Sequence, residues 1–401
     1  MKRGTAVVVG GGVSGLTLSF KLLKNQKFNR VVLLEKKNKI GGWLETKQFS
    51  GIGLFEQGPR SVRVSGGEET LKLLKEIELN PLLPTLQSKA RFILTPNRSG
   101  DSSEIRELFP SSKLEFFSKS PMAPLLPDII KNQVPKKSAN LFFSDHFFKI
   151  IFFYKFLVRN KQFTGRETIY EFFSAQFGER LARTIGAAAI GGIYAGDIEK
   201  LSTRDCFPIF FDTMEAGKSS SLLLASLKKA FSGKKTNETK MDEKIKSAGA
   251  YSFTKGMQQL PNEIRSVLET NFSDQFHLMQ NQTILQIEKN EKSNVSTAYL
   301  SDSSKIEFDH LFFTTPSFET GTILRNFTGN EHNENISRTI QLLESIHYAD
   351  IAVINMAWNS SLNTPQGFGY LVSPTTCASI LGVTFDRFFP LFFPSMLYPL
   401  T

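Results

Sequence analysis

Three glycines in the spacing G-x-G-x-x-G constrain the fold of this chain more than any other feature. They are Gly10, Gly12 and Gly15. An apolar, strand-like run at residues 5–9 precedes them, and a second such run at 31–34 ends on Glu35. Because glycine has no Cβ, these positions permit a tight turn, close approach to a pyrophosphate and close packing of the following helix on the strand. The pattern predicts a β-α-β unit that binds a dinucleotide.

The electrostatics of this unit also suit a dinucleotide. The helix after the glycines points its N-terminus at the phosphates, where free N–H groups and the helix dipole favour an anion by about 0.3–1 kcal/mol per charge. Glu35 lies twenty residues after Gly15, where a carboxylate accepts hydrogen bonds from ribose hydroxyls and disfavours the extra phosphate of NADP. A plain glycine-rich turn is the alternative, but strand, glycines, helix, strand and acid all occur in order.

A second glycine pair indicates which dinucleotide is bound. Gly41-Gly42 follows Glu35 by six residues, and Trp43 and a strand-like run at 44–49 come next. This extension suggests FAD and resembles the flavoprotein superfamily of monoamine oxidases, phytoene desaturases and protoporphyrinogen oxidases. No second G-x-G-x-x-G follows a strand elsewhere, so a separate NAD(P)H domain is not expected.

The composition favours an apolar or anionic partner over nucleic acid. Of the 401 residues 40% are hydrophobic and 37 are Phe, and the formal net charge is +10. This length predicts two or three lobes, and the charge suits an anionic membrane surface, nucleic acid or an acidic small molecule. Lys and Arg are scattered, without a zinc-finger, helix-turn-helix or aromatic RNA-binding signature. We therefore expect no nucleic-acid partner.

Cysteine and histidine usage makes a disulfide framework and a metal site unexpected. The chain has two cysteines, Cys206 and Cys377, which indicates a reducing compartment. The five histidines never approach the i, i+3 or i, i+4 spacing of a metal site. Because the first strand begins at Thr5, no cleavable presequence is expected, and any organelle address is internal to the fold.

Periodicity predicts the other elements. Apolar positions at Leu71, Leu74 and Ile77 predict a helix, and helical patterns run over residues 165–197. Two stretches read as loops: the Pro/Ser-rich residues 94–127 and the polar, lysine-rich residues 232–249. Alternation predicts strands that form an antiparallel piece capping the nucleotide sheet. These strands are residues 275–279, 283–287, 295–300 and 306–314.

The run LFFSDHFFKIIFFYKFLV at residues 141–158 has almost the length of a membrane span. Asp145, His146, Lys149 and Lys155 interrupt it, and each charge at the bilayer centre costs about 2.5–3.5 kcal/mol, so we reject a transmembrane helix. Periodicity alone leaves two interpretations open. One is a helix buried on nearly all sides, and the other is a helix whose phenylalanines dip into the membrane interface while lysines reach the headgroups.

Segments beyond the nucleotide motif resemble protoporphyrinogen oxidases, in the same order, over residues 4–386. They are FEQGPRSVR (55–63), ARF (90–92), GGIYAGD (191–197), LSTRDCFP (201–208), KGMQQLP (255–261), DHLFFTTP (309–316) and QGFGYLV (366–372). The resemblance implies FAD-dependent oxidation of protoporphyrinogen IX to protoporphyrin IX with O₂, releasing H₂O₂, in heme biosynthesis. It also implies peripheral docking of the middle helical lobe on the mitochondrial inner membrane, and it is compatible with a homodimer.

The resemblance further assigns site residues. FAD carries the redox chemistry while the protein holds a substrate methylene bridge against flavin N5 and excludes water, so no side chain is assigned as catalytic. Arg91 matches an arginine that binds a propionate, and Phe368 matches an aromatic residue that stacks on the tetrapyrrole; a surface charge and core packing are their alternatives. The expected substrate-binding residues are Arg91, Gly192, Phe368 and Leu371. The expected FAD-binding residues are Gly10, Gly12, Val13, Ser14, Gly15, Glu35, Lys36, Gly42, Trp43, Gly58, Pro59, Arg60, Ser61 and Ile284.

The expected fold class is α/β, with a Rossmann-like FAD-binding domain, an α+β substrate domain and an inserted helical membrane-binding domain. The predicted boundaries are 1–89 and 250–320 for the FAD-binding domain, 90–104, 210–249 and 321–401 for the substrate domain, and 105–209 for the helical domain.

The end of the sequence departs from the family. After LGVTFDR (381–387) the likeness stops, and a mixture of Phe and Pro follows. Because relatives continue, with a segment that contacts the flavin ring, we expect a truncated product. That expectation leaves a non-catalytic remnant open as a second hypothesis, and another flavin amine oxidase or desaturase is a third.

Overall fold

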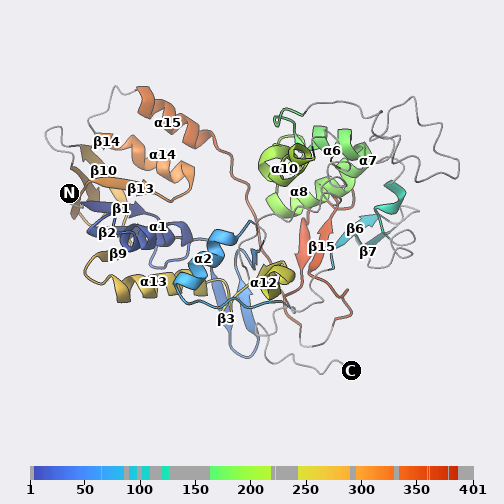
Figure 1. Ribbon diagram of the computed structural model, residues 1–401, viewed down its shortest axis with the longest axis horizontal. Helices are drawn as coiled ribbons and strands as arrows, with labels where there is room; N and C mark the ends of the chain where they lie inside the picture. Colours follow the sequence, from blue (N-terminus) through green and yellow to red (C-terminus); the bar gives the residue numbers. More distant parts are fainter. Residues whose placement is uncertain are drawn as a thin grey trace. The chain divides into compact units, whose positions relative to one another are not determined.

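The computed structural model, drawn in Figure 1, describes residues 4–64, 66–84, 90–96, 102–108, 120–125, 163–217, 222, 243–289, 295–328, 334–358, 360, 362–377 and 379–386. The chain divides into two compact units. Among the described residues, unit 1 comprises those within Met1–Thr85 and Asp242–Ser361, and unit 2 comprises those within Leu86–Met241 and Leu362–Phe388.

Unit 1 is built on a parallel sheet of four strands in the order β13-β1-β2-β9. Its strands are β1 (Thr5–Val9), β2 (Arg30–Glu35), β9 (Phe276–Gln280) and β13 (His310–Phe313). The apolar residues of β1 and β2 are buried on both faces. Continuous apolar runs are typical of parallel strands that are covered on both sides, and the predicted β-α-β unit is confirmed.

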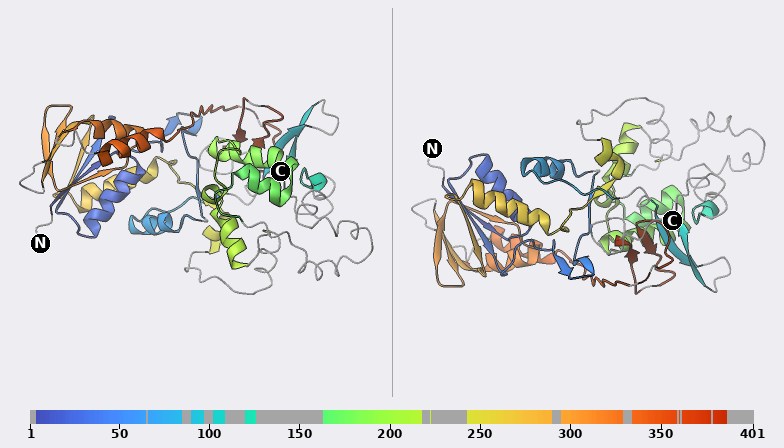
Figure 2. Two further views of the ribbon diagram at one scale, coloured as in Figure 1. Left: turned by 90° about the horizontal axis from the view of Figure 1, so that it is seen from above. Right: turned by 90° about the horizontal axis from the view of Figure 1, so that it is seen from below.

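Two helices cover one face of this sheet. They are α1 (Val13–Lys24) and α13 (Gln259–Asn271), which pack against each other (Figure 2). In α1 the buried Leu16, Phe20 and Leu23 recur at helical spacing, so the helix presents one apolar stripe to the sheet.

An antiparallel sheet packs on the opposite face. It contains β10 (Ile284–Lys289), β11 (Ser296–Leu300) and β12 (Lys305–Phe308), and β14 (Phe327–Thr328) joins its edge parallel to β10. Ile287 and Leu300 of this sheet share one buried core with Val7, Val32 and Leu34 of the parallel sheet.

The predicted capping piece is correct only for these central strands. Residues 276–280 and 310–313 belong to the parallel sheet, and the predicted strand at 306–314 is two strands that separate at Asp309. There the Asp309 carboxylate accepts from the N–H of Thr5 at 2.7 Å. Alternation shows that a segment is a strand but does not identify its partner.

The predicted domain boundary at residue 320 also differs from the structure. Helix α14 (Ser317–Arg325) buries Ile323 in the core of unit 1, and β14 pairs with β10. Arg325 then forms an ion pair with Glu344 of α15 (Glu334–Ser345). These contacts place residues 321–361 in unit 1, whereas the sequence assigned them to the substrate domain.

Smaller elements complete unit 1. They are β3 (Thr46–Phe49), β4 (Gly53–Glu56), β5 (Val62–Arg63), α2 (Glu68–Glu76), α12 (Glu243–Ala248) and β8 (Ala250–Tyr251). Strands β3 and β4 pair with each other, as do β5 and β8. The predicted helix around Leu71 and Leu74 is confirmed. The predicted loop at 232–249 ends in α12, which the sequence missed.

Unit 2 contains a second sheet of four strands, in the order β16-β15-β6-β7. The strands are β6 (Phe92–Pro96), β7 (Ser103–Glu107), β15 (Gly369–Val372) and β16 (Gly382–Thr384), with β15 parallel to β6. The prediction of loops throughout 94–127 is therefore wrong for β7. Its sequence SEIRE is short and polar and gives no strand signal without its partner β6.

The helices of unit 2 bury a phenylalanine-rich core. They are α6 (Ile169–Phe177), α7 (Glu179–Leu181), the π-helical turn η5 (Ala182–Gly186), α8 (Ala187–Tyr194), α9 (Thr203–Cys206) and α10 (Pro208–Ala216), with the 3₁₀ turn η2 at Ala123–Leu125. Phe172 is fully buried, with ring contacts to Phe173 and Phe211. Because α8 packs on β15, helices and sheet form one unit, whereas the sequence predicted separate helical and substrate domains.

Two predicted features lie outside the described residues. They are the phenylalanine-rich segment at 141–158 and the end of the chain at 388–401. Among the helices that the structure does describe, none combines the length and apolarity needed to cross a membrane.

Candidate functional site

In the turn of unit 1, glycine occupies each of the three motif positions for a different steric reason. Gly10 has φ +110°, a conformation that side chains disfavour. A Cβ on Gly15 would overlap the carbonyl oxygen of Gly10, so only glycine lets α1 start this close to the strand. A Cβ on Gly12 would meet nothing nearer than the Gly42 Cα, at 3.9 Å. The protein leaves space above Gly12, as close approach by a phosphate requires.

The turn is held from both sides. Gly10 donates to the carbonyl of Leu34 at 2.8 Å, which connects it to β2. The hydroxyl of Thr314, directly after β13, donates to the carbonyl of Val9 at 2.8 Å. Sequence reasoning noted the DHLFFTTP segment but did not assign this role to Thr314.

Glu35 lies where the motif predicts. Its carboxylate accepts from the backbone N–H of Gly11 at 2.7 Å and from that of Lys37 at 2.8 Å. A carboxylate has about four lone-pair sites, so two fixed backbone bonds orient it and leave capacity for ribose hydroxyls.

The second glycine pair contacts the first motif directly. Gly41 donates to the carbonyl of Gly11 at 2.9 Å, and the backbones of Gly12 and Gly41 form a β-bridge. Gly42 has φ +60°, and Trp43 is 72% exposed. The glycine pair therefore lies directly beside the space above Gly12. This position agrees with the prediction that the pair belongs to the FAD-binding site.

The other predicted cofactor residues of unit 1 occupy varied positions. Val13 and Ser14 are the first residues of α1, and the Lys36 Nζ lies 3.3 Å from the Glu319 Oε1. Ile284 is 3% exposed and packs in the core between the sheets, and its role in binding FAD stays a prediction.

The GPRS segment after β4 supplies the remaining four. Its members are Gly58, Pro59, Arg60 and Ser61. A Cβ on Gly58 would overlap the carbonyl oxygen of Trp43, so this segment packs closely on the residue after the second glycine pair. Arg60 donates to the Asn355 side-chain oxygen at 2.7 Å.

A buried glutamate that the sequence analysis missed fixes this neighbourhood. Glu56 is 1% exposed, and its carboxylate accepts from the Thr46 hydroxyl at 2.8 Å and the Met257 N–H at 2.8 Å. The Thr46 hydroxyl accepts in turn from the N–H of Gln258 at 3.1 Å. Both motifs that meet here, FEQGPR and KGMQQLP, were visible in the sequence. Their contact was not, because a buried carboxylate needs partners that only the tertiary structure supplies.

The residues present fit FAD. The space above Gly12, the N-terminal amides of α1 and the oriented carboxylate of Glu35 suit a pyrophosphate and a ribose.

Unit 2 brings together the four predicted substrate residues in two pairs. The guanidinium carbon of Arg91 lies 5.0 Å from the centroid of the Phe368 ring, within the range of a cation–π contact. At Gly192, a Cβ would overlap the side chain of Leu371 and lie 3.2 Å from the Leu381 carbonyl oxygen. Both pairs meet on the segment that contains β15.

The backbone around these pairs requires glycine in QGFG. A Cβ on Gly367 would overlap the ring of Phe92, and Gly369 has φ +145° with β16 directly against it. Near Gly192 the apolar side chains of Ile193 and Leu381 are 43% and 41% exposed. The site in unit 2 therefore combines one arginine with an exposed apolar surface.

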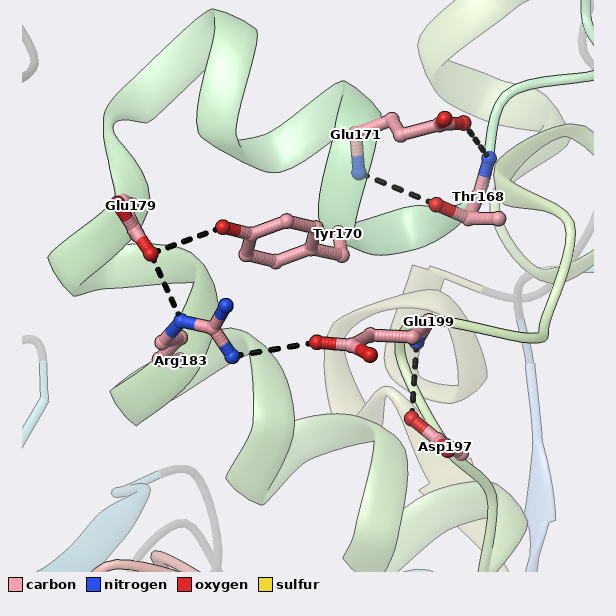
Figure 3. A network of polar contacts seen from close by, with 7 residues as sticks. All are labelled: Thr168, Tyr170, Glu171, Glu179, Arg183, Asp197 and Glu199. Carbon is pink, nitrogen blue, oxygen red and sulfur yellow. Dashed lines mark hydrogen bonds and ion pairs between the residues drawn. The ribbon is translucent and has the colours of Figure 1, made fainter.

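A polar network fixes the helix that carries Gly192. Arg183, in the π-helical turn before α8, donates to Glu179 at 2.9 Å and to Glu199 at 3.2 Å (Figure 3). The guanidinium also lies 4.4 Å from the centroid of the Tyr170 ring, whose hydroxyl donates to Glu179 at 2.9 Å. Because Glu179 precedes α8 and Glu199 follows it, the network holds both ends of this helix.

The network lowers the pKa of one of its carboxyl groups, that of Glu179. The Arg183 guanidinium and then the Tyr170 hydroxyl lower the pKa of the Glu179 carboxyl. A carboxyl whose pKa is lowered on folding contributes stability above its unfolded pKa of about 4.3, and this contribution is lost as the pH falls through the folded pKa.

We expect Gly12→Ala and Gly15→Ala to fail in different ways. Alanine at Gly12 meets only open space within the protein, so this variant should fold like the wild type and lose affinity for FAD. Alanine at Gly15 overlaps the Gly10 carbonyl, so this variant should unfold at lower urea concentration. Fluorescence titration with FAD and urea unfolding monitored by circular dichroism measure the two effects. Normal FAD affinity in Gly12→Ala would refute the assignment of this space to the cofactor.

Glu179→Gln should destabilise the protein at neutral pH and have little effect in acid. The wild type loses the Glu179 contribution as the carboxyl is protonated below about pH 4, so the two free energies of unfolding should converge there. Urea unfolding at pH values from about 7 to 3 measures the difference, with Glu215→Gln on α10 as the exposed control. A difference that stays constant with pH would contradict this origin.

Comparison with known proteins agrees with the geometry. The sequence profile of the family described as flavin containing amine oxidoreductase matches residues 13–395. A protoporphyrinogen oxidase of Dictyostelium discoideum is 26% identical over 94% of this chain and 72% of its own length. The human protoporphyrinogen oxidase is 25% identical over 95% of this chain and 72% of its own length.

A solved structure shares the fold. A protein of Exiguobacterium sp. 255-15 aligns with a TM-score of 0.61 at 17% identity, over 96% of this chain and 73% of that chain. Since the family profile matches nearly the whole chain and the residues of unit 1 fit a dinucleotide, the cofactor is FAD. The chain belongs to the flavin containing amine oxidoreductase family and is an FAD-dependent oxidoreductase.

Proposed function

We propose that this chain oxidises protoporphyrinogen IX to protoporphyrin IX, with O₂ as acceptor and H₂O₂ as the second product. The observation that carries this proposal is the arrangement in unit 2, where Arg91 lies over Phe368 and exposed apolar side chains surround Gly192. Relatives named protoporphyrinogen oxidase that align with almost the whole chain give it independent support.

The chemistry of the substrate matches these residues. A tetrapyrrole with two propionates needs a cationic anchor and a large apolar surface. Arginine is suited to the anchor because its planar fork binds a carboxylate through two parallel hydrogen bonds. The Phe368 ring restricts the guanidinium, which reduces the side-chain entropy lost when a propionate binds. The absence of a Cβ at Gly192 lets Leu371 and the backbone of Leu381 pack directly against the helix, and the neighbouring exposed side chains of Ile193 and Leu381 provide apolar surface for a flat ring.

The residues of unit 1 would hold the cofactor. The glycine turn and the start of α1 would bind the pyrophosphate, Glu35 the ribose, and the GPRS segment with Arg60 the flavin end. When FAD is bound it would supply two-electron oxidation at flavin N5, and three such oxidations, each with one O₂ reduced to H₂O₂, account for the six electrons removed from the substrate. The positive charge of Arg60 would favour the reduced, anionic ring.

We also propose peripheral association with the mitochondrial inner membrane, and a homodimer as the assembly. The support for membrane association is the net charge of +10 and the phenylalanine-rich sequence at 141–158. Its lysines would reach anionic headgroups while the phenylalanines enter the interface.

The purified chain should contain FAD that bleaches without oxygen when protoporphyrinogen IX is added. We expect Arg91→Ala to raise KM about 10- to 100-fold, the equivalent of one charged hydrogen bond, and Arg91→Lys to raise it less. Steady-state kinetics measures this, with the exposed Arg166→Ala as control. Methyl esterification of the propionates should raise KM for the wild type but not for Arg91→Ala. A colourless protein, or unchanged kinetics in Arg91→Ala, would refute the corresponding part of the proposal.

Membrane association predicts binding to anionic vesicles that weakens with salt. The double variant Phe147→Ser/Phe148→Ser should bind less than the wild type, because each serine removes apolar surface from the interface. Sedimentation with vesicles of phosphatidylcholine and cardiolipin measures binding, and Phe318→Ser, at a 44% exposed phenylalanine of α14, is the control. Equal sedimentation of all three proteins would contradict the role of this segment.

A further inference from the structure

The run at residues 346–358 of unit 1 reverses the usual pattern of burial. Most of its large apolar side chains are exposed, with Ile354 at 79% and Met356 at 63%. Asn355, between these two, is half-buried. An inward polar residue flanked by outward apolar residues is more informative than an exposed isoleucine alone. It indicates that the contacts of Asn355, rather than apolar packing, determine how this run lies.

The Asn355 amide bridges two groups of the GPRS neighbourhood. Its nitrogen donates to the backbone carbonyl of Glu56 at 2.9 Å, and its oxygen accepts from the guanidinium of Arg60 at 2.7 Å. An asparagine amide has one donating and one accepting end, and here both ends are used on groups four residues apart in the sequence.

One end of the bridge is rigid. The buried carboxylate of Glu56 is bonded to Thr46 and to the backbone of Met257, so the Glu56 carbonyl has a fixed position. Because the Asn355 amide is bonded to this carbonyl, its oxygen, which accepts from Arg60, is also held in place. An arginine side chain has many accessible rotamers, so a fixed acceptor keeps its charge in one place.

We propose that Asn355 is a positioning residue that holds the Arg60 guanidinium for the flavin. This inference rests on the proposed placement of Arg60 beside the flavin. The chemistry of an amide suits the task, because Asn355 accepts from Arg60 without adding a negative charge. An aspartate in its place would keep the acceptor but oppose the positive charge that favours a reduced, anionic flavin.

The test measures the flavin midpoint potential of the FAD-loaded full chain, without any substrate. Arg60→Met should make the potential more negative, and Asn355→Leu should shift it in the same direction by a smaller amount. Asn355→Asp should also lower it, although the contact with Arg60 is retained. In the Arg60→Met/Asn355→Leu double variant the shift should equal that of Arg60→Met alone, since Asn355 acts through Arg60.

Controls separate this role from a structural one. Ile354→Ser changes the neighbouring exposed position and should leave the potential unchanged. Asn355→Ser, which is small and polar, gives a second variant should Asn355→Leu not fold, and urea unfolding checks both. A second readout is sulfite, which adds to flavin N5. Its dissociation constant should rise roughly tenfold in Arg60→Met, the equivalent of one charged interaction, and less in Asn355→Leu.

The outcomes distinguish the placement of Arg60 beside the flavin from the positioning role of Asn355. Should Arg60→Met shift neither the potential nor the sulfite affinity, Arg60 does not act on the flavin, and both its proposed placement and this inference are overturned. A shift in Arg60→Met without one in the Asn355 variants, or fully additive shifts in the double variant, would overturn the role of Asn355 alone. Neither result depends on which substrate the enzyme oxidises.

Discussion

The contact between Gly15 and the carbonyl of Gly10 is the constraint on which the cofactor site depends. With no Cβ at Gly15, α1 begins directly against the turn that ends β1. The amides at the start of α1 therefore lie at the carboxyl end of the sheet, next to the Glu35 carboxylate that accepts from Gly11. Gly41 joins the same turn through the carbonyl of Gly11. A larger residue at Gly15 would move the helix and the groups aligned on it.

Sequence alone was sufficient for features determined by local sterics or by strict spacing. The three glycines and the acid twenty residues later specify a turn, a helix start and a strand end, and each lies where it was predicted. The substrate pairs have a different origin. Physical reasoning alone favoured a surface charge for Arg91 and left core packing as the alternative for Phe368, and the family resemblance was needed to select both residues. The structure then brought Arg91 and Phe368 together from positions far apart in the sequence.

What the sequence did not show depends on tertiary partners. Residues 276–280 and 310–313 alternate like the strands of the antiparallel sheet, but their partners are β2 and β1, and alternation carries no information on pairing. Glu56 and Asn355 are polar residues that the structure turns inward. Their side chains would be ordinary surface groups without Thr46, Met257 and Arg60 as partners. In the sequence, a polar residue within an apolar run marks Asn355, whereas Glu56 is followed by Gln57 and Gly58 and has no such signal.

The proposed cofactor and substrate residues lie in different units, and each set is fixed by contacts within its own unit. In unit 1 a buried carboxylate and a neutral amide hold the segment that contains Arg60. In unit 2 the Arg183 network holds the helix that carries Gly192. Because the contacts that fix the glycine turn lie within unit 1, changes in the apolar side chains of unit 2 should alter substrate preference with little effect on the geometry of the glycine turn. A flavoprotein family built in this way can diversify its substrates while the glycine turn, Glu35 and Glu56 keep the cofactor geometry constant.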